Sequence, residues 1–299
     1  MDLPARRQPP TVRLRRLASE LRGLRTAANL TREEVAEQTG VNPATLYRIE
    51  TARVRPQRRT LLALLDKYGV TDQDRRAELV DLSRQATQLG WLQAYESELP
   101  EEYTAYISFE AEARGVRNYE SLFMPGLLQT ESYARHVIRG ALPLANDEET
   151  ERRVEARLQR QELITKKPPL ELWAIIDEAA IHRLVGGPAV MAGQLDALVR
   201  AAAHPHVTVQ VIPFERGAHP GMPGSFVVMD FPDAADPDLV YIDSMAGDLF
   251  LEREPDVRRY TVVFEHLRAL ALDPSSSLQM IETKIQILNE EGGWGHERP

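Results

Sequence analysis

Apolar residues recur with helical spacing in the first part of the chain. One stripe with 3-4-3 spacing predicts a first helix and contains Leu14, Leu17, Leu21 and Leu24. A run of leucines from Leu61 to Tyr68 predicts a fourth helix that ends at Gly69, and a fifth is expected over about 72–89. Two more helices are expected between the first and the fourth. Residues 1–90 are therefore predicted to form an all-α domain of five short helices around one small core.

The segment between the first and fourth helices contains two helix starts separated by a glycine. Thr31 and Glu34 have the spacing of a capping box, and Gly40 lies where a helix ends in a left-handed residue. Asn42 and Pro43 then form a good N-cap followed by the residue best tolerated at the first helical position. So short a link predicts a steep crossing of the second and third helices, which is helix-turn-helix geometry.

The remaining residues, 91–299, alternate between helical and strand-like patterns. Helices are expected near 101–115, 127–140, 148–166, 190–203 and 255–272. Strands are expected at 170–176, 207–214, 225–231, 239–243 and 248–252. Val207, Val209 and Val211 alternate in the second of these, which predicts a half-buried strand. We therefore expect an α+β protein, whose second domain is a larger mixed α/β sensor or partner-binding domain.

Charge separates the two halves of the chain. Residues 1–70 carry a net charge of +7, whereas residues 71–299 carry −16. This difference in charge favours contact of a polyanion such as nucleic acid with residues 1–70 alone, because the acidic residues 71–299 would repel it. Chance clustering of surface charge is the alternative.

Composition narrows the class of protein further. The chain has no cysteine, which excludes disulfides, thiol catalysis and cysteine-rich zinc sites. It has no secretory h-region and no apolar run of the ~18 residues that span a membrane. A cytoplasmic protein with no membrane contact is expected.

The third helix has one apolar side and one polar side. Leu46 and Ile49 are the inward pair. The residues expected on the outer side are Asn42, Ala44, Thr45, Tyr47 and Arg48. A recognition helix presents this part to base edges in the major groove of double-stranded DNA. There Arg48 could pair with guanine, Asn42 with a base or phosphate, and Ala44 or Thr45 could contact a thymine methyl.

Other arginines near this helix are expected to contact the DNA backbone. Arg32 begins the second helix, and Arg53, Arg55, Arg58 and Arg59 follow the third. Such phosphate contacts position a protein without reading sequence. A solvated helical bundle with surface arginines is the competing interpretation.

The segment LRGLRTAANLTREEVAEQTGVNPATLYRIETARVRP, residues 21–56, resembles the Xre/Cro-type helix-turn-helix of phage-repressor relatives. The family pattern has glutamine where this chain has Arg32, and Glu-Asn-Gly where it has Glu50, Thr51 and Ala52. The glycine that usually helps the turn after the third helix is therefore missing.

The second half contains several long motifs in one order. They are GWLQAY (90–95), YESLFMPGLLQTESYAR (119–135), LELWAIIDEAAIHRLVGG (170–187), VTVQVIPFERGAHPGMPGSFVVMDF (207–231) and VYIDSMAGDLFLE (240–252). With the first half, they closely resemble WhiJ-like regulators of actinobacteria, which join an Xre domain to an antitoxin-like C-terminal domain. The resemblance implies a transcriptional regulator encoded beside a small partner protein that it binds or counteracts.

Catalytic patterns are weak in the second domain. His204 and His206 resemble a metal-ligand pair but have no matched third ligand. Four aspartates near strand ends could gather around Mg²⁺ or act as turn and cap residues: Asp177, Asp230, Asp243 and Asp248. No P-loop, GxSxG or HExxH motif is present. No enzyme, metal or cofactor is expected.

Two apolar segments have alternative interpretations. Phe123, Leu127 and Leu128 could be core or a docking groove for a partner. The last helix has a 3-4-3 seam, formed by Leu278, Ile281, Ile285 and Leu288. This seam could pack on its own domain or on a second subunit. A homodimer would suit a palindromic operator with half-sites about 10 bp apart.

Three functions remain open from the sequence. The first is a sequence-specific transcriptional regulator whose C-terminal domain binds a small protein or a metabolite. The second is an antitoxin-like protein that sequesters a small partner and binds DNA for autoregulation. The third is a nucleic-acid-processing enzyme that uses the strand-end aspartates.

Overall fold

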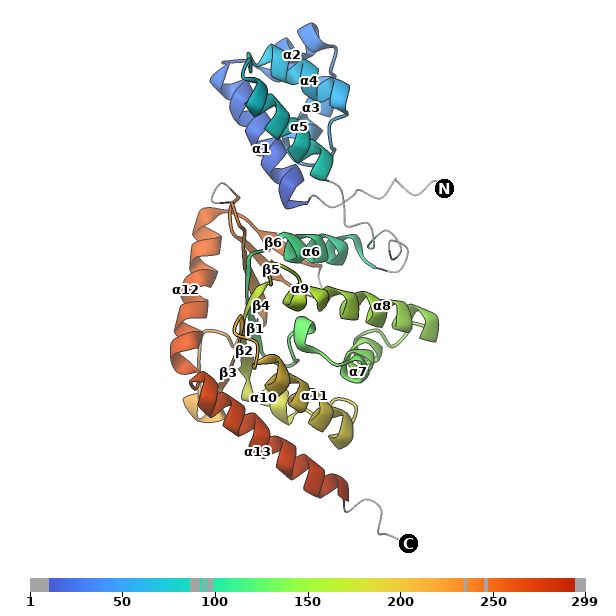
Figure 1. Cartoon of the computed structure of the whole chain (residues 1–299), viewed down its shortest axis with the longest axis vertical. Coiled ribbons are helices and arrows are strands. Elements are labelled where there is room, and N and C mark those ends of the chain that lie inside the picture. Colours follow the sequence, from blue (N-terminus) through green and yellow to red (C-terminus); the bar gives the residue numbers. More distant parts are fainter. Residues whose placement is uncertain are drawn as a thin grey trace. The chain divides into compact units, whose positions relative to one another are not determined.

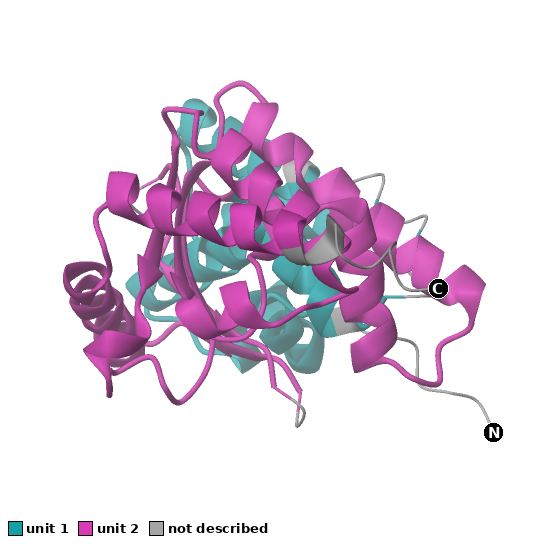
Figure 2. Cartoon of the chain, turned by 90° about the horizontal axis from the view of Figure 1, so that it is seen from below, with its two compact units in different colours: residues 1–112 teal, residues 113–299 magenta. Residues whose placement is uncertain are grey.

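The chain divides into two compact units, Met1–Glu112 and Ala113–Pro299 (Figure 2). The computed structural model describes residues 11–86, 92, 95, 99–233, 236–244 and 247–293. The domain boundary predicted at 90/91 lies outside these residues. The division into units falls later in the chain, at Glu112, because α6 (Glu101–Glu112) packs against the first helix.

The first unit is entirely helical in its described residues. Its other helices are α1 (Val12–Ala27), α2 (Arg32–Thr39), α3 (Pro43–Glu50), α4 (Arg58–Lys67) and α5 (Gln73–Gln85). Its core contains Leu17, Leu21, Val35, Leu46, Ile49, Leu61, Leu64, Leu65, Tyr68 and Leu79. The five predicted helices are therefore confirmed, because each contributes apolar side chains to this cluster. Leu89, the predicted end of the fifth helix, lies outside the described residues.

The second unit is built on a six-stranded mixed sheet of order β3-β2-β1-β4-β5-β6. The strands are β1 (Gly115–Glu120), β2 (Glu171–Asp177), β3 (Val207–Ile212), β4 (Phe226–Asp230), β5 (Leu239–Ile242) and β6 (Leu249–Leu251). The first three strands are parallel, and β4, β5 and β6 continue the sheet in antiparallel pairs. The predicted mixed α/β domain is confirmed.

Helices cover both faces of this sheet (Figure 1). They are α7 (Glu131–Ala141), α8 (Asp147–Arg160), α9 (Glu162–Thr165), α10 (Glu178–His182), α11 (Pro188–Ala201), α12 (Glu254–Leu270) and α13 (Pro274–Gly293). Figure 1 shows α12 on one side of the sheet and α7, α8 and α11 on the other. Short 3-10 turns occupy Gly126–Leu128 and Phe214–Arg216. Phe264 and Leu267 of α12 pack on Tyr119, Ile175 and Val228 of the sheet.

Two features of the sheet differ from the sequence predictions. No strand was expected at Gly115–Glu120, yet β1 lies in the centre of the sheet between β2 and β4. Its sequence, GVRNYE, has no apolar run, and its buried Asn118 is polar. The half-buried strand predicted at Val207 is buried on both faces, because Gln210 and Ile212 of β3 are covered as well.

Gly221 allows the chain after β3 to pack closely on the sheet. A Cβ atom at Gly221 would lie 2.6 Å from ring atoms of Tyr119, a side chain with no solvent exposure. We expect Gly221→Ala to lower the free energy of unfolding of the second unit by about 1–3 kcal/mol, because neither group can move without disturbing the core. Urea denaturation followed by tryptophan fluorescence measures this change.

Gly193 is the matched control for this substitution. It lies inside α11 with open space where a Cβ would be. Gly193→Ala should therefore raise the free energy of unfolding by about 0.5–1 kcal/mol. A Gly221→Ala variant as stable as the parent would contradict the close packing described here.

Candidate nucleic-acid interface

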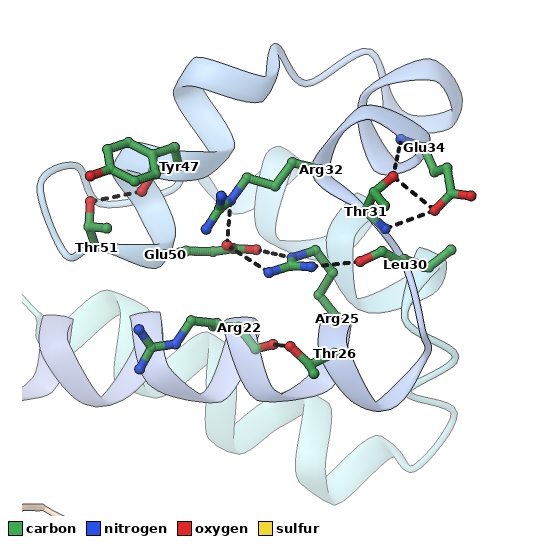
Figure 3. Close-up of polar contacts among 10 residues, drawn as sticks. All are labelled: Arg22, Arg25, Thr26, Leu30, Thr31, Arg32, Glu34, Tyr47, Glu50 and Thr51. Carbon is green, nitrogen blue, oxygen red and sulfur yellow. Dashed lines mark hydrogen bonds and ion pairs between the residues drawn. The ribbon is translucent and has the colours of Figure 1, made fainter.

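Local capping interactions begin α2 and α3, and a left-handed glycine ends α2 before the turn. The Thr31 amide donates to Glu34 Oε2 (2.8 Å), and Thr31 Oγ1 accepts from the Glu34 amide (3.2 Å; Figure 3). Gly40 ends α2 with φ +70°, and Asn42 Oδ1 accepts from the Ala44 amide (2.8 Å) to begin α3. The predicted capping box, left-handed glycine and N-cap are all present in the structure.

The outward side of α3 carries the residues that the sequence pattern placed there. Leu46 and Ile49 are buried in the core of the first unit. Asn42, Ala44, Tyr47 and Arg48 are exposed, and Thr45 is half-buried. Asn42 uses its side-chain oxygen as the cap of α3, so its amide nitrogen is the group available for a base or a phosphate.

A buried carboxylate connects the three helices of this region. Glu50, at the end of α3, has no side-chain exposure. Its oxygens accept from Nε and Nη2 of Arg25 in α1 at 2.6 and 3.2 Å, and from Nε of Arg32 in α2 at 2.8 Å (Figure 3). The hydrogen bond to Glu50 raises the pKa of Arg25. This charged triad fixes α3 relative to α1 and α2.

Arg32 therefore has a structural partner in addition to the predicted backbone contact. Only its Nε is bound to Glu50, and about a third of its side chain is exposed. Its guanidinium carbon also lies 5.2 Å from the centroid of the Tyr47 ring, within the range of a cation–π contact. Arg53 makes a second such contact with Tyr47 at 5.5 Å. Glu50 thus supports Arg32, which in turn orders the exposed aromatic ring.

Glu50 was not among the residues that the sequence pattern assigned to this interface. The sequence contains a signal for this role, because Glu50 follows the inward Leu46 by four residues, which places both on the same side of α3. A charged residue at such a position requires a buried partner. Which arginines supply that partner depends on the packing of α1 and α2 against α3.

The predicted phosphate-contacting arginines lie beyond α3. Arg53 and Arg55 are exposed in the segment between α3 and α4, and Arg55 Nη1 lies 3.5 Å from the Ser83 carbonyl. Arg58 and Arg59 are exposed in the first turn of α4, whose N-cap makes no side-chain hydrogen bond. Unpaired amides and two arginines at one helix N-terminus favour the binding of an anion such as a DNA phosphate.

Ala52 takes the backbone conformation for which the related pattern has glycine. Its φ is +55°, and its amide donates to the Ile49 carbonyl at 3.1 Å. Its methyl group is buried beside Leu14, Ala18 and Ala86. The turn therefore forms without glycine, with a buried methyl group to offset the left-handed backbone.

The strand-end aspartates do not come together. Asp177 lies at the carboxyl end of β2 and binds His219, whereas Asp230 pairs with Gly115 at the opposite end of the sheet. They separate because β4 runs antiparallel to β1. Asp248 accepts from the Tyr241 hydroxyl. Among the described residues, no group of three or more metal-binding side chains occurs.

The structure distinguishes the two interpretations of each apolar segment. Leu127 and Leu128 are buried, so this pair belongs to the core, while Phe123 is exposed. In α13, Ile281 and Leu288 are buried, and the helix packs against α11 of its own unit. The predicted seam is therefore used within the unit, since two of its four residues are buried there.

The geometry of α2 and α3 defines a helix-turn-helix protein, and residues 16–79 match the helix-turn-helix domain family. Residues 103–283, more than half of the chain, match the family described as domain of unknown function DUF5753. The chain belongs to this family. No curated protein and no solved structure matches it. Of the described helices, none is both long and apolar enough to cross a membrane.

Proposed function

We propose that the protein is a sequence-specific transcriptional regulator that reads the major groove of double-stranded DNA with α3. The observation that carries this proposal is the outward side of α3, where Arg48 is exposed beside the Tyr47 ring. The inward side of α3 is held in place by the buried Leu46 and by the ion pairs of Glu50 with Arg25 and Arg32. A rigid support with exposed polar tips is what base readout requires. Arg53, Arg55, Arg58 and Arg59 supply phosphate contacts on the same unit.

The second unit receives the regulatory signal in this proposal. Its binding partner is a small protein, as the resemblance to WhiJ-like regulators implies, or a metabolite. A palindromic operator and a homodimer are part of the same proposal, because two-fold symmetry doubles the contacts of a short recognition helix. The dimer contact would lie outside the α13 seam, because Ile281 and Leu288 of this seam are buried within one chain.

Arg48→Ala tests the readout of bases. The operator is first selected from fragments of the native genome with the full chain, and binding is then measured by fluorescence anisotropy. The loss of a bidentate guanine contact should cost about 1–3 kcal/mol on the operator and relax the preference at one base position. Unchanged affinity and unchanged preference would remove Arg48 from the readout.

Arg58→Ala is the matched control, since it removes an exposed arginine at the N-terminus of α4. A phosphate contact carries no sequence information, so operator and random DNA should weaken about equally. The slope of log K against log salt concentration should fall by about 1. If both variants behaved alike, the division into base and phosphate contacts would be wrong.

A further inference from the structure

A row of contacts joins the buried Glu50 to the segment that follows α3. Glu50 accepts from Nε of Arg32 at 2.8 Å. Figure 3 shows the Arg32 guanidinium between this carboxylate and the Tyr47 ring, and its carbon lies 5.2 Å from the ring centroid. The guanidinium carbon of Arg53 lies 5.5 Å from the same centroid. Tyr47 therefore connects Arg53 to the charged triad.

The Tyr47 ring is the group that orients the Arg53 side chain. Arg53 is exposed, and its guanidinium makes no hydrogen bond or ion pair with the described residues. Its backbone is fixed, because its amide donates to the Arg48 carbonyl at 2.8 Å. A free arginine side chain loses rotamer freedom when it binds a ligand, and this loss weakens the binding. The cation–π contact restricts the Arg53 side chain before a ligand arrives.

Arg32 is oriented from the other direction, by Glu50. Its Nε is bound to the carboxylate, and neither Nη has a hydrogen-bond partner in the part of the chain that the structure describes. A guanidinium held at one nitrogen presents its other N–H groups in a fixed plane, which suits the oxygens of a phosphate. Arg32 and Arg53 thus offer unpaired donors on the side of α3 that carries Tyr47.

The charges around Tyr47 favour an anion. Three arginines are connected through Glu50 and Tyr47, and they share one bound carboxylate, that of Glu50. They are Arg25, Arg32 and Arg53. The exposed neighbours Glu33 and Arg48 have opposite charges and cancel. Three arginines and one carboxylate leave an excess of two positive charges, which attracts a phosphate backbone.

Tyr47 itself is not part of the core of the first unit. Its side chain is 41% exposed, whereas Leu46 and Ile49 of the same helix lie in the buried cluster. Alanine at this position would remove no core side chain and would suit a helix. The contacts of the ring with two arginines, and not its burial, therefore define what Tyr47 contributes.

We propose that Tyr47 is a positioning residue for DNA binding. Its ring holds Arg53 beside Arg32, so that the two guanidinium groups bind phosphates of the DNA backbone next to the bases that α3 reads. The proposal rests on the proposed function, since it takes α3 as the recognition helix. It adds that Tyr47 acts through the two arginines and not by contact with a base.

Tyr47→Ala and Tyr47→Phe in the full chain test this role. Binding to the selected operator and to random DNA of the same length is measured by fluorescence anisotropy. We expect Tyr47→Ala to weaken both by about three- to tenfold, because Arg53 is then ordered only on binding and a phosphate contact is independent of sequence. Tyr47→Phe keeps the ring and should bind both DNAs within about twofold of the parent.

A double-mutant cycle identifies the group through which Tyr47 acts. In an Arg53→Ala background, Tyr47→Ala should weaken binding by less than about twofold, because the side chain that the ring positions is absent. Arg58→Ala is the matched background, since it removes an exposed arginine from the N-terminus of α4. There the loss of about three- to tenfold should remain.

Several results would overturn the proposal. Binding of Tyr47→Ala equal to that of the parent would do so, as would a loss confined to the operator, which would indicate contact with a base. A loss for Tyr47→Phe as large as that for Tyr47→Ala would assign the effect to the hydroxyl group. An undiminished loss in the Arg53→Ala background would show that Tyr47 does not act through Arg53.

Inorganic pyrophosphate separates this failure from a failure of the proposed function. The side-chain Nε–H resonances of Arg32 and Arg53 in the full chain should shift as pyrophosphate is added. In Tyr47→Ala, the Arg53 resonance should indicate about threefold weaker binding. Resonances that did not move in the parent would overturn the proposal. A parent chain that selected no genomic DNA would overturn the proposed function, while these resonances would still decide whether Tyr47 positions the arginines for a phosphate.

Discussion

Glu50→Ala is expected to lower the free energy of unfolding of the first unit by about 3–5 kcal/mol. The substitution leaves Arg25, with 14% of its side chain exposed, without the carboxylate that binds two of its nitrogens. It also releases Arg32 from α3. Removing one member of a buried ion pair is costly because the remaining charge stays desolvated. Hydrogen exchange measured on peptides from α1 to α4 reports the first unit separately from the second.

Glu37→Ala is the matched control, because Glu37 is an exposed glutamate on α2. Its effect should stay within about 0.5 kcal/mol. A loss below about 1 kcal/mol for Glu50→Ala would mean that the triad does not stabilise the unit. DNA binding should fall with Glu50→Ala even at temperatures where the unit remains folded, since α3 loses the contacts that orient it.

A second large effect concerns the pH dependence of the second unit. Glu120 ends β1, and burial raises its pKa to about 7. Hydrogen bonds from Ser225 and Asn118 and the charge of Arg157 oppose this rise, while the charge of Asp243 adds to it. Because burial dominates, the folded state keeps the proton over a range in which the unfolded chain has lost it.

The sign of the effect follows from proton binding. Between about pH 4.5 and 7 the folded state binds more protons at Glu120 than the unfolded state, so the free energy of unfolding falls as pH rises. We expect Glu120→Gln to match the parent near pH 4.5 and to exceed its stability by about 3–4 kcal/mol above pH 7, because the pKa rises from 4.5 to about 7 at about 1.4 kcal/mol per pKa unit. Urea denaturation at pH 5 and pH 8, followed by tryptophan fluorescence, measures the difference.

Glu171→Gln controls for the loss of a negative charge, because Glu171 is exposed at the start of β2. Its difference from the parent should be similar at both pH values. If Glu120→Gln gave no larger gain at pH 8 than at pH 5, Glu120 would not be the group that titrates between these values.

Local signals in the sequence were sufficient to predict the helix-turn-helix. Thr31, Glu34, Gly40 and Asn42 act through neighbours within four residues, so their caps and turn could be predicted without the rest of the fold. The inward pair of α3 followed from helical spacing in the same way. The DNA contacts themselves remain a prediction that the proposed experiments test.

The centre of the second unit could not be predicted in this way. β1 has no apolar run, and its place between β2 and β4 depends on backbone hydrogen bonds to segments far along the chain. For the same reason the sequence left open whether Asp177 and Asp230 gather, and the structure places them at opposite ends of the sheet, since strand direction is a property of the pairing.

The sequence by itself determined the helices of the first unit, their caps and the polar side of α3, because these features depend on spacing over one or two turns. Only the tertiary structure decided that Glu50 binds Arg25 and Arg32 and that α13 packs on α11. Each of these joins residues from separate elements, and their meeting depends on how the whole chain packs.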